Sequence, residues 1–198
     1  MLLSELTTMR VGGPARELVT ARTRDEIVDA ALGAWSAGDE WLVLGGGSNV
    51  LVSDAGFDGT VIHVASRGIE RARGDVPRLL VQAGEPWDAV VAYAVEHGLA
   101  GIEALSGIPG STGAAPVQNI GAYGQELAGA LVAIEFLDYR TGEVQRLAAA
   151  GLGLGYRTSA LKRGRQGIVL AVELELSPRE DGAIAYPQLA TALGVGLG

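Results

Sequence analysis

The most informative stretch of the sequence is Gly107-Ile-Pro-Gly-Ser-Thr-Gly-Ala-Ala-Pro-Val-Gln-Asn-Ile-Gly-Ala-Tyr-Gly124, which is too long and too rich in small residues to be an ordinary connection. Glycine permits positive φ and close approach of a ligand to the main chain, whereas Pro109 and Pro116 limit the freedom that glycine brings. Gln118 and Asn119 add side-chain donors and acceptors. The pattern predicts backbone held against a ligand, with a flexible Gly/Ser-type spacer as the alternative.

A second glycine motif, Leu44-Gly-Gly-Gly-Ser-Asn-Val-Leu51, follows the apolar run at 41–44 and is predicted to be a turn that leaves a buried strand. Consecutive backbone amides in such a turn can form an anion-binding nest. Alone the motif equally indicates a tight turn, because it is neither the dinucleotide fingerprint GxGxxG nor the phosphate loop GxxxxGK[ST].

Length and composition define the class of protein. A chain of 198 residues, 48% hydrophobic and 19% charged, can bury a core of one domain or of two small domains that share a cleft. Its apolar runs are too short for a membrane helix and its start shows no secretory signal, so we expect a soluble, cytoplasmic protein.

The absence of cysteine and the presence of only two histidines argue against disulfides, thiolate catalysis and a catalytic metal. A net charge of −8 opposes nonspecific binding to nucleic acid, yet leaves room for a local basic pocket near Arg157, Lys162, Arg163 and Arg165.

Helices and strands are predicted from capping residues and apolar periodicity. One helix runs from a capping box at Thr23 to near Gly38, and another runs from Pro86 to His97, whose imidazole suits the last turn of a helix better than catalysis. His63 is expected to be solvated or hydrogen-bonded in a strand. Strands are predicted at 17–21, 41–44, 59–64, 78–82 and 167–176, with a hairpin of 131–139 and 143–147, and a subdomain boundary is placed near residue 84.

Together, the two glycine motifs and Gly155-Tyr-Arg-Thr-Ser-Ala-Leu-Lys162 resemble the UDP-N-acetylenolpyruvoylglucosamine reductase family, and the segment 7–15 looks like that family's opening. The resemblance implies an α+β fold of the vanillyl-alcohol-oxidase (PCMH) type, built of two α/β FAD-binding subdomains at 1–84 and 85–198. It also implies noncovalent FAD, NADPH as reductant and UDP-N-acetylglucosamine enolpyruvate as substrate, in peptidoglycan biosynthesis.

The resemblance further implies roles for particular residues. The FAD pyrophosphate would be cradled by Gly45, Gly46, Gly47, Ser48 and Asn49. The rest of the flavin would be lined by Pro109, Gly110, Ser111, Gly113, Ala114, Gln118, Asn119, Gly121, Tyr123 and Ile168. These assignments suit the chemistry, since a pyrophosphate needs convergent amides and a flavin ring needs a dry slot with few hydrogen bonds.

Substrate binding is implied for Tyr156, Arg157 and Tyr186. Arg157 matches the family's active-site arginine, which suits a substrate carboxylate and the charge that develops beside it. The alternative for Arg157 is a surface ion pair, and the alternative for Tyr186 is a packed aromatic.

The family's proton-donating serine and its assisting glutamate lie in a C-terminal substrate domain, whereas the sequence ends at Gly198. We therefore expect this chain to be the FAD-binding part, with that domain absent. Two other hypotheses stay open: a flavoprotein oxidase of the same superfamily, often with flavin attached through histidine, and a non-catalytic FAD-binding module. The sequence does not indicate the oligomeric state.

Overall fold

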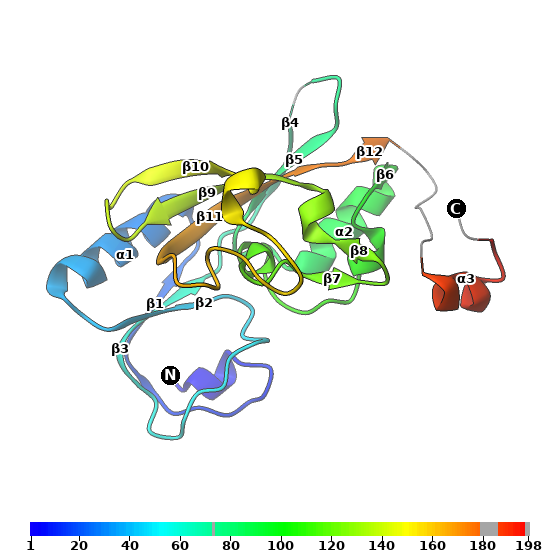
Figure 1. The fold of residues 1–198 in the computed structure, drawn as a ribbon. Helices are drawn as coiled ribbons and strands as arrows, with labels where there is room; N and C mark the ends of the chain where they lie inside the picture. The colour runs from blue at the N-terminus through cyan, green and yellow to red at the C-terminus, as the bar shows by residue number, and fades with distance from the viewer. Residues whose placement is uncertain (73, 179–185, 197–198) are drawn as a thin grey trace.

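The computed structural model describes residues 1–198 except 73, 179–185 and 197–198 (Figure 1). Its helices are α1 (Arg24–Ala37), α2 (Trp87–Glu96) and α3 (Pro187–Leu193), with short 3-10 turns η1 (Leu3–Glu5), η2 (Glu103–Leu105), η3 (Thr112–Val117), η4 (Leu127–Gly129) and η5 (Ala149–Leu152). Its strands are β1 (Ala15–Ala21), β2 (Trp41–Leu44), β3 (Phe57–Val64), β4 (Ile69–Ala72), β5 (Arg78–Gln82), β6 (Leu99–Ala100), β7 (Gly121–Ala122), β8 (Gln125–Glu126), β9 (Leu131–Asp138), β10 (Val144–Ala148), β11 (Gly167–Glu175) and β12 (Ser177–Pro178).

The first sheet is parallel, with strand order β1-β3-β2. Helix α1 connects β1 to β2, as a parallel arrangement requires. Its start follows the predicted capping signal, because the Thr23 hydroxyl accepts a hydrogen bond from the Glu26 amide at 3.2 Å. Its end is set by Gly38, which takes the left-handed conformation at φ 72°.

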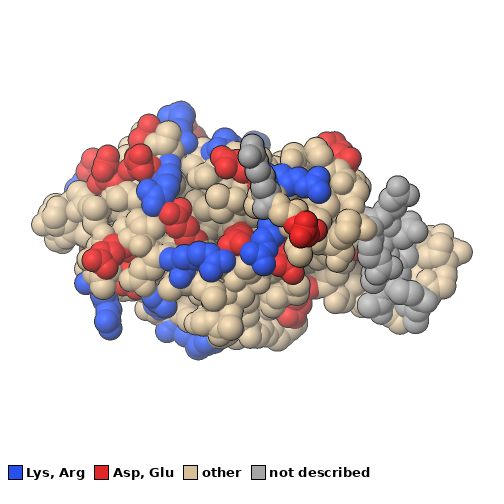
Figure 2. Space-filling model, turned by 90° about the horizontal axis from the view of Figure 1, so that it is seen from above, with Lys and Arg blue, Asp and Glu red and all other residues tan. Residues whose placement is uncertain are grey.

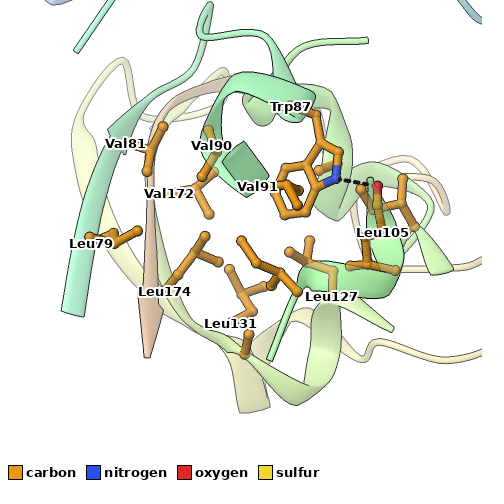
Figure 3. Close-up of a cluster of buried hydrophobic side chains, with 14 of the residues drawn as sticks. Leu79, Val81, Trp87, Val90, Val91, Leu105, Leu127, Leu131, Val172 and Leu174 are labelled. Atoms are coloured by element: carbon orange, nitrogen blue, oxygen red, sulfur yellow. Dashed lines mark hydrogen bonds between the residues drawn. The ribbon is translucent and has the colours of Figure 1, made fainter. Parts of the chain in front are cut away.

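The second sheet is antiparallel, with strand order β10-β9-β11-β5-β4. Helix α2 packs on one face of this sheet, where Trp87 is 1% exposed and donates its indole N–H to the Leu105 carbonyl at 3.0 Å (Figure 3). Leu79, Val172 and Leu174 contribute to the same core from the sheet. Helix α2 is therefore fixed by a buried aromatic whose one polar atom is satisfied.

The two sheets share a further core around α1. Ile27 and Ala31 of α1 pack with Ile62 of the first sheet and with Leu137 and Leu170 of the second. Because α1 is buried against both sheets, it fixes their relative position, and with it the gap between them.

Most predicted elements are confirmed, but strand 78–82 does not belong to the sheet of the first predicted subdomain. Strand β5 pairs with β11 and with β4, a strand that was not predicted, so both belong to the antiparallel sheet. The chain passes from the first sheet to the second between residues 64 and 69, whereas the subdomain boundary was predicted near residue 84. The pairing of β5 is a long-range contact that its alternating pattern does not encode.

The exposed ends of the second sheet carry ion pairs, such as Arg78 to Glu175 at 2.8 Å and Arg146 to Glu173 at 2.6 Å. Figure 2 shows acidic and basic side chains interspersed over the face seen from above, with no continuous basic stripe. Among the described residues, no helix is long and apolar enough to cross a membrane.

Candidate cofactor site

Two adjoining hollows lie between the sheets. The apolar hollow, of about 330 Å³, is lined by Trp41, Val43, Gly45, Val64, Ala83, Ser111, Gly113, Ala114, Val117, Phe136, Leu161, Gly164, Arg165, Gln166, Gly167, Ile168 and Val169. The glycine hollow, of about 320 Å³, is lined by Val43, Leu44, Gly45, Gly46, Gly47, Ser48, Asn49, Val50, Trp87, Pro109, Gly110, Ser111, Ala114, Ala115, Val117, Gln118, Ile120 and Lys162. Five residues line both, so the hollows form one elongated cleft suited to a dinucleotide-sized ligand.

The glycine loop after β2 has no room for side chains. A Cβ on Gly45 would overlap the Ser111 hydroxyl, and one on Gly46 would lie 3.0 Å from the Gly110 Cα. Gly47 has φ 66°, and a Cβ there would overlap the Leu6 carbonyl. The three glycines are thus required by packing as well as by any ligand that approaches the loop.

The opposing wall, 109–113, is held by backbone hydrogen bonds rather than left flexible. The Trp87 amide donates to the Gly110 carbonyl at 3.0 Å, and the Gly113 amide donates to the Ala83 carbonyl at 2.8 Å. The segment continues into η3, so the long glycine-rich stretch is an ordered wall and not a spacer. Across the cleft, the Ser48 hydroxyl donates to the Pro109 carbonyl at 3.3 Å, which joins the two glycine motifs.

One basic side chain at the rim of the apolar hollow is already paired. Arg165 lies over the Phe136 ring and donates to the Asp138 carboxylate at 3.0 Å. Burial raises the pKa of Asp138, but hydrogen bonds from Arg165 and from the Arg140 amide outweigh it, so the pKa falls below its ordinary value. The positive charge of Arg165 at the rim of the apolar hollow is therefore balanced by the Asp138 carboxylate.

The predicted substrate residues lie beyond the glycine hollow. Arg157 has φ 52°, and its guanidinium donates to the Gly121 carbonyl at 2.6 Å. Tyr156 is 84% exposed, with its ring centroid 5.9 Å from the Arg157 guanidinium carbon. Tyr186 packs edge-on against Tyr123, their centroids 5.7 Å apart. The structure thus gathers an arginine and exposed aromatic rings around the end of segment 109–124.

Most predicted cofactor residues line the cleft. Those that line the glycine hollow are Gly45, Gly46, Gly47, Ser48, Asn49, Pro109, Gly110, Ser111, Ala114 and Gln118. The apolar hollow receives Gly113 and Ile168, the latter 1% exposed.

Three predicted cofactor residues do not line either hollow. The Asn119 side chain is buried and bonded within the protein, Gly121 uses its carbonyl to hold Arg157, and Tyr123 packs on Tyr186. They belong with the arginine-bearing end of the cleft instead, and their roles stay proposals.

Sequence reasoning missed much of the apolar hollow. Trp41 and Val43 alternate along β2 toward the hollow, and Phe136 and Gly167 face it from the second sheet. Their alternation was visible, but an apolar side chain that walls a cavity has the same sequence pattern as one in a core. Lys162 of the predicted basic pocket lines the glycine hollow.

The histidines have different surroundings. His97 caps α2 and its Nδ1 lies 2.7 Å from the Tyr93 carbonyl, as expected for a structural residue. His63 lines another small hollow that adjoins the glycine hollow, together with Thr8 and Arg67. Burial, and then the charges of Arg22 and Arg67, lower the pKa of His63, so it favours the neutral imidazole.

An α+β fold with a glycine-walled cleft between a parallel and an antiparallel sheet defines a nucleotide-cofactor domain. The chain belongs to the family described as FAD binding domain, which matches residues 15–148. The expected FAD-binding fold is thereby confirmed, and FAD is the cofactor of this family.

Over nearly its whole length the chain is similar to UDP-N-acetylenolpyruvoylglucosamine reductases. It is 62% identical to that of Leifsonia xyli over 99% of this chain and 55% of the relative. It is 49% identical to that of Saccharopolyspora erythraea over 96% of this chain and 53% of the relative. The crystal structure of the reductase from Thermus caldophilus matches with a TM-score of 0.76 and 37% identity, over 90% of this chain and 62% of that one. The chain thus spans about half the length of the curated relatives it matches.

The residues of the cleft fit FAD. Gly45, Gly46 and Gly47 line the glycine hollow with main chain and no side chain, which suits a pyrophosphate. The apolar hollow offers Ile168, Val43 and Phe136 to a ring system, with few charged groups beside it.

Proposed function

We propose that this chain is the FAD-binding part of an enzyme that reduces UDP-N-acetylglucosamine enolpyruvate to UDP-N-acetylmuramate with NADPH, in the cytoplasm. The observation that carries the proposal is the joined cleft, in which two glycine motifs 61 positions apart meet and lead to Arg157. The 62% identity to a reductase over 99% of the chain supports it.

In this proposal the glycine loop 45–49 and the wall 109–113 hold FAD without a covalent bond. Amides of the loop bind the pyrophosphate, and Ile168 with the rest of the apolar hollow shields a ring from water. When bound, FAD would carry two electrons from NADPH to the enolpyruvyl double bond.

Arg157 is proposed to bind the substrate carboxylate. Its planar guanidinium can hold a carboxylate through two N–H groups, which places the double bond and stabilises negative charge that develops next to it. One of its nitrogens donates to the Gly121 carbonyl, so the head group is held in one orientation before substrate arrives. Tyr156 and Tyr186 are proposed to contact the sugar nucleotide through their exposed rings.

Cofactor binding is the first test. The purified chain is titrated with FAD, and flavin fluorescence and visible absorbance are followed. We expect saturable binding of one FAD and loss of all flavin on denaturation, with the mass of the denatured chain unchanged. A folded chain that takes up no FAD would refute the proposal.

The mass spectrum also tests the oxidase hypothesis. His63 lies beside the glycine loop, so a covalent flavin adduct on the peptide that contains His63 would favour the oxidase. NADPH oxidation with and without the UDP-sugar then separates a reductase from a non-catalytic module. The sample for that assay is the protein at the length of its reductase relatives, which are about twice as long as this chain.

A further inference from the structure

Asn119 is the most completely bonded side chain near the proposed site. It is 1% exposed, and its Nδ2 donates to the Gly155 carbonyl at 3.1 Å and to the Glu126 carboxylate at 2.9 Å. Its Oδ1 accepts from the Ala128 amide at 2.9 Å. With both donors and an acceptor site used inside the protein, the amide has little capacity left for a cofactor.

Asn119 bonds to the turn that carries Arg157. Gly155 and Thr158 close this turn by two mutual backbone hydrogen bonds, each of 3.1 Å, and Arg157 lies between them. The Asn119 bond to the Gly155 carbonyl attaches the first residue of the turn to segment 117–128. The Ser159 hydroxyl attaches its far side, by donating to the Val117 carbonyl at 2.6 Å.

The backbone of both partners is held in an uncommon conformation. Asn119 has φ 46° and Arg157 has φ 52°, in the left-handed region that residues other than glycine rarely occupy. Asparagine tolerates this region better than most residues, whereas arginine gains nothing from it. A left-handed arginine persists only where its surroundings hold it there. Asn119 and Ser159 hold the two sides of its turn, and the Lys162 ammonium also reaches it, by donating to the Arg157 carbonyl at 2.9 Å.

We propose that Asn119 is a positioning residue, which fixes the 155–158 turn so that the Arg157 guanidinium is presented at the end of the cleft. The catalytic significance of this rests on the proposed function of Arg157, but the positioning itself concerns only this chain. The inference replaces the flavin-binding role that the sequence resemblance implied for Asn119.

The test compares two substitutions that tolerate positive φ. Asn119→Gly removes the whole amide. Asn119→Asp keeps the acceptor for the Ala128 amide but loses the donors to the Gly155 carbonyl and to the Glu126 carboxylate. Gln125→Ala is the matched control, because the side-chain amide of Gln125 also makes two hydrogen bonds. It accepts from the Ala104 amide and donates to the Glu103 carboxylate, and neither bond reaches the 155–158 turn.

The readout is the guanidinium resonance of Arg157 in the chain labelled with ¹⁵N-arginine, assigned as the signal lost in Arg157→Lys. In both Asn119 variants we expect this signal to shift toward that of a solvated arginine and its N–H exchange with water to accelerate about tenfold, while the other arginines stay unchanged. Gln125→Ala should leave the Arg157 signal in place. The FAD dissociation constant should stay within about threefold of wild type in all three variants.

An Arg157 signal that is unaffected in Asn119→Asp would overturn the inference, as would a loss of FAD affinity of about tenfold or more in that variant. If one Asn119 variant does not fold, the other decides alone, because Asn119→Gly adds no charge beside Glu126 and Asn119→Asp keeps the shape of the side chain. If the wild-type chain binds no FAD, the proposed function fails, whereas the arginine spectra still decide the role of Asn119.

Discussion

The substitution Gly45→Ala tests whether the two glycine motifs are fitted to one another. A methyl group at position 45 would overlap the Ser111 hydroxyl, while the Ser111 Cβ would lie 3.4 Å away, at an ordinary contact distance. Ser111 is buried and belongs to the wall 109–113, which backbone bonds to residues 83–87 hold in place. The overlap therefore has to be relieved by moving the hydroxyl or the loop.

The expected magnitude follows from overpacking a closely packed site. Inserting one methyl group with forced rotamer or backbone shifts costs about 1–3 kcal/mol of unfolding free energy. Ser111→Ala removes the overlapping atom and should itself cost less than about 1 kcal/mol. The double variant Gly45→Ala/Ser111→Ala should then be within about 0.5 kcal/mol of Ser111→Ala, so the coupling should be close to the whole cost of Gly45→Ala, about 1–3 kcal/mol.

Urea unfolding followed by tryptophan fluorescence measures these differences. Gly46→Ala is the matched control, because its Cβ would approach backbone atoms of Gly110, at 3.0 Å and 3.2 Å, that Ser111→Ala leaves in place. The reasoning is refuted if Gly45→Ala is as stable as wild type, or if Ser111→Ala rescues Gly46→Ala as well as it rescues Gly45→Ala.

Three further predictions use other parts of the chain. Gly33→Ala, within α1 and with no atom within 4 Å of the added Cβ, should raise the unfolding free energy by about 0.5–1 kcal/mol in the same urea assay; a loss of stability would show that the helix surface is not open there. Because the pKa of His63 is lowered on folding from 6.5, the unfolded chain takes up the proton first, so the stability present above about pH 6.5 declines as the pH falls below it. His63→Gln should reduce that decline in melting temperatures measured from pH 8 to 5, and an unchanged slope would contradict the assignment. In the proposed reductase, Arg157→Lys should retain FAD but slow the transfer from reduced flavin to the UDP-sugar by about 10²–10³-fold in stopped-flow measurements, since lysine cannot replace the planar guanidinium. Wild-type rates for both half-reactions of the Lys variant would return Arg157 to a surface role.

The elements that could be predicted are those whose signals are local. The two ends of α1 are marked by Thr23, whose hydroxyl caps the first turn, and by Gly38, which takes the left-handed conformation after the last turn. Both residues do in the structure what their residue types favour. The membership of β5 in the second sheet could not be predicted this way, because its partners in β11 lie more than 80 residues further along the chain. A strand's own pattern specifies which face is buried, but it does not name the strand beside it.

The same distinction applies to the site. The placement of glycines 45–47 and 110 at the site could be predicted, because glycine runs occur where the chain needs a positive φ or a close approach to its backbone. In the structure these glycines allow the two loops to pack together as much as they allow a ligand to approach. The positioning role that we propose for Asn119 could not be predicted, since an amide in a ligand-facing segment looks the same in sequence whether it bonds a cofactor or a neighbouring turn. The hydrogen bonds of the Asn119 side chain, to the Gly155 carbonyl, the Glu126 carboxylate and the Ala128 amide, are what the structure adds to separate these roles.

The cleft exists because distant parts of the chain are held at a fixed separation. The glycine loop belongs to the parallel sheet, and its opposing wall is bonded to residues that lead from β5 into α2. Ile27 and Ala31 of helix α1 belong to the core that both sheets share, which holds the two sheets, and with them the loop and the wall, in a fixed relation. A motif of three glycines can thus form either an ordinary turn or one side of a cofactor site. In this chain the motif forms one side of a cleft because the apolar residues of α1 hold the two sheets together. Those residues lie outside both glycine motifs, so neither motif alone could have predicted the cleft.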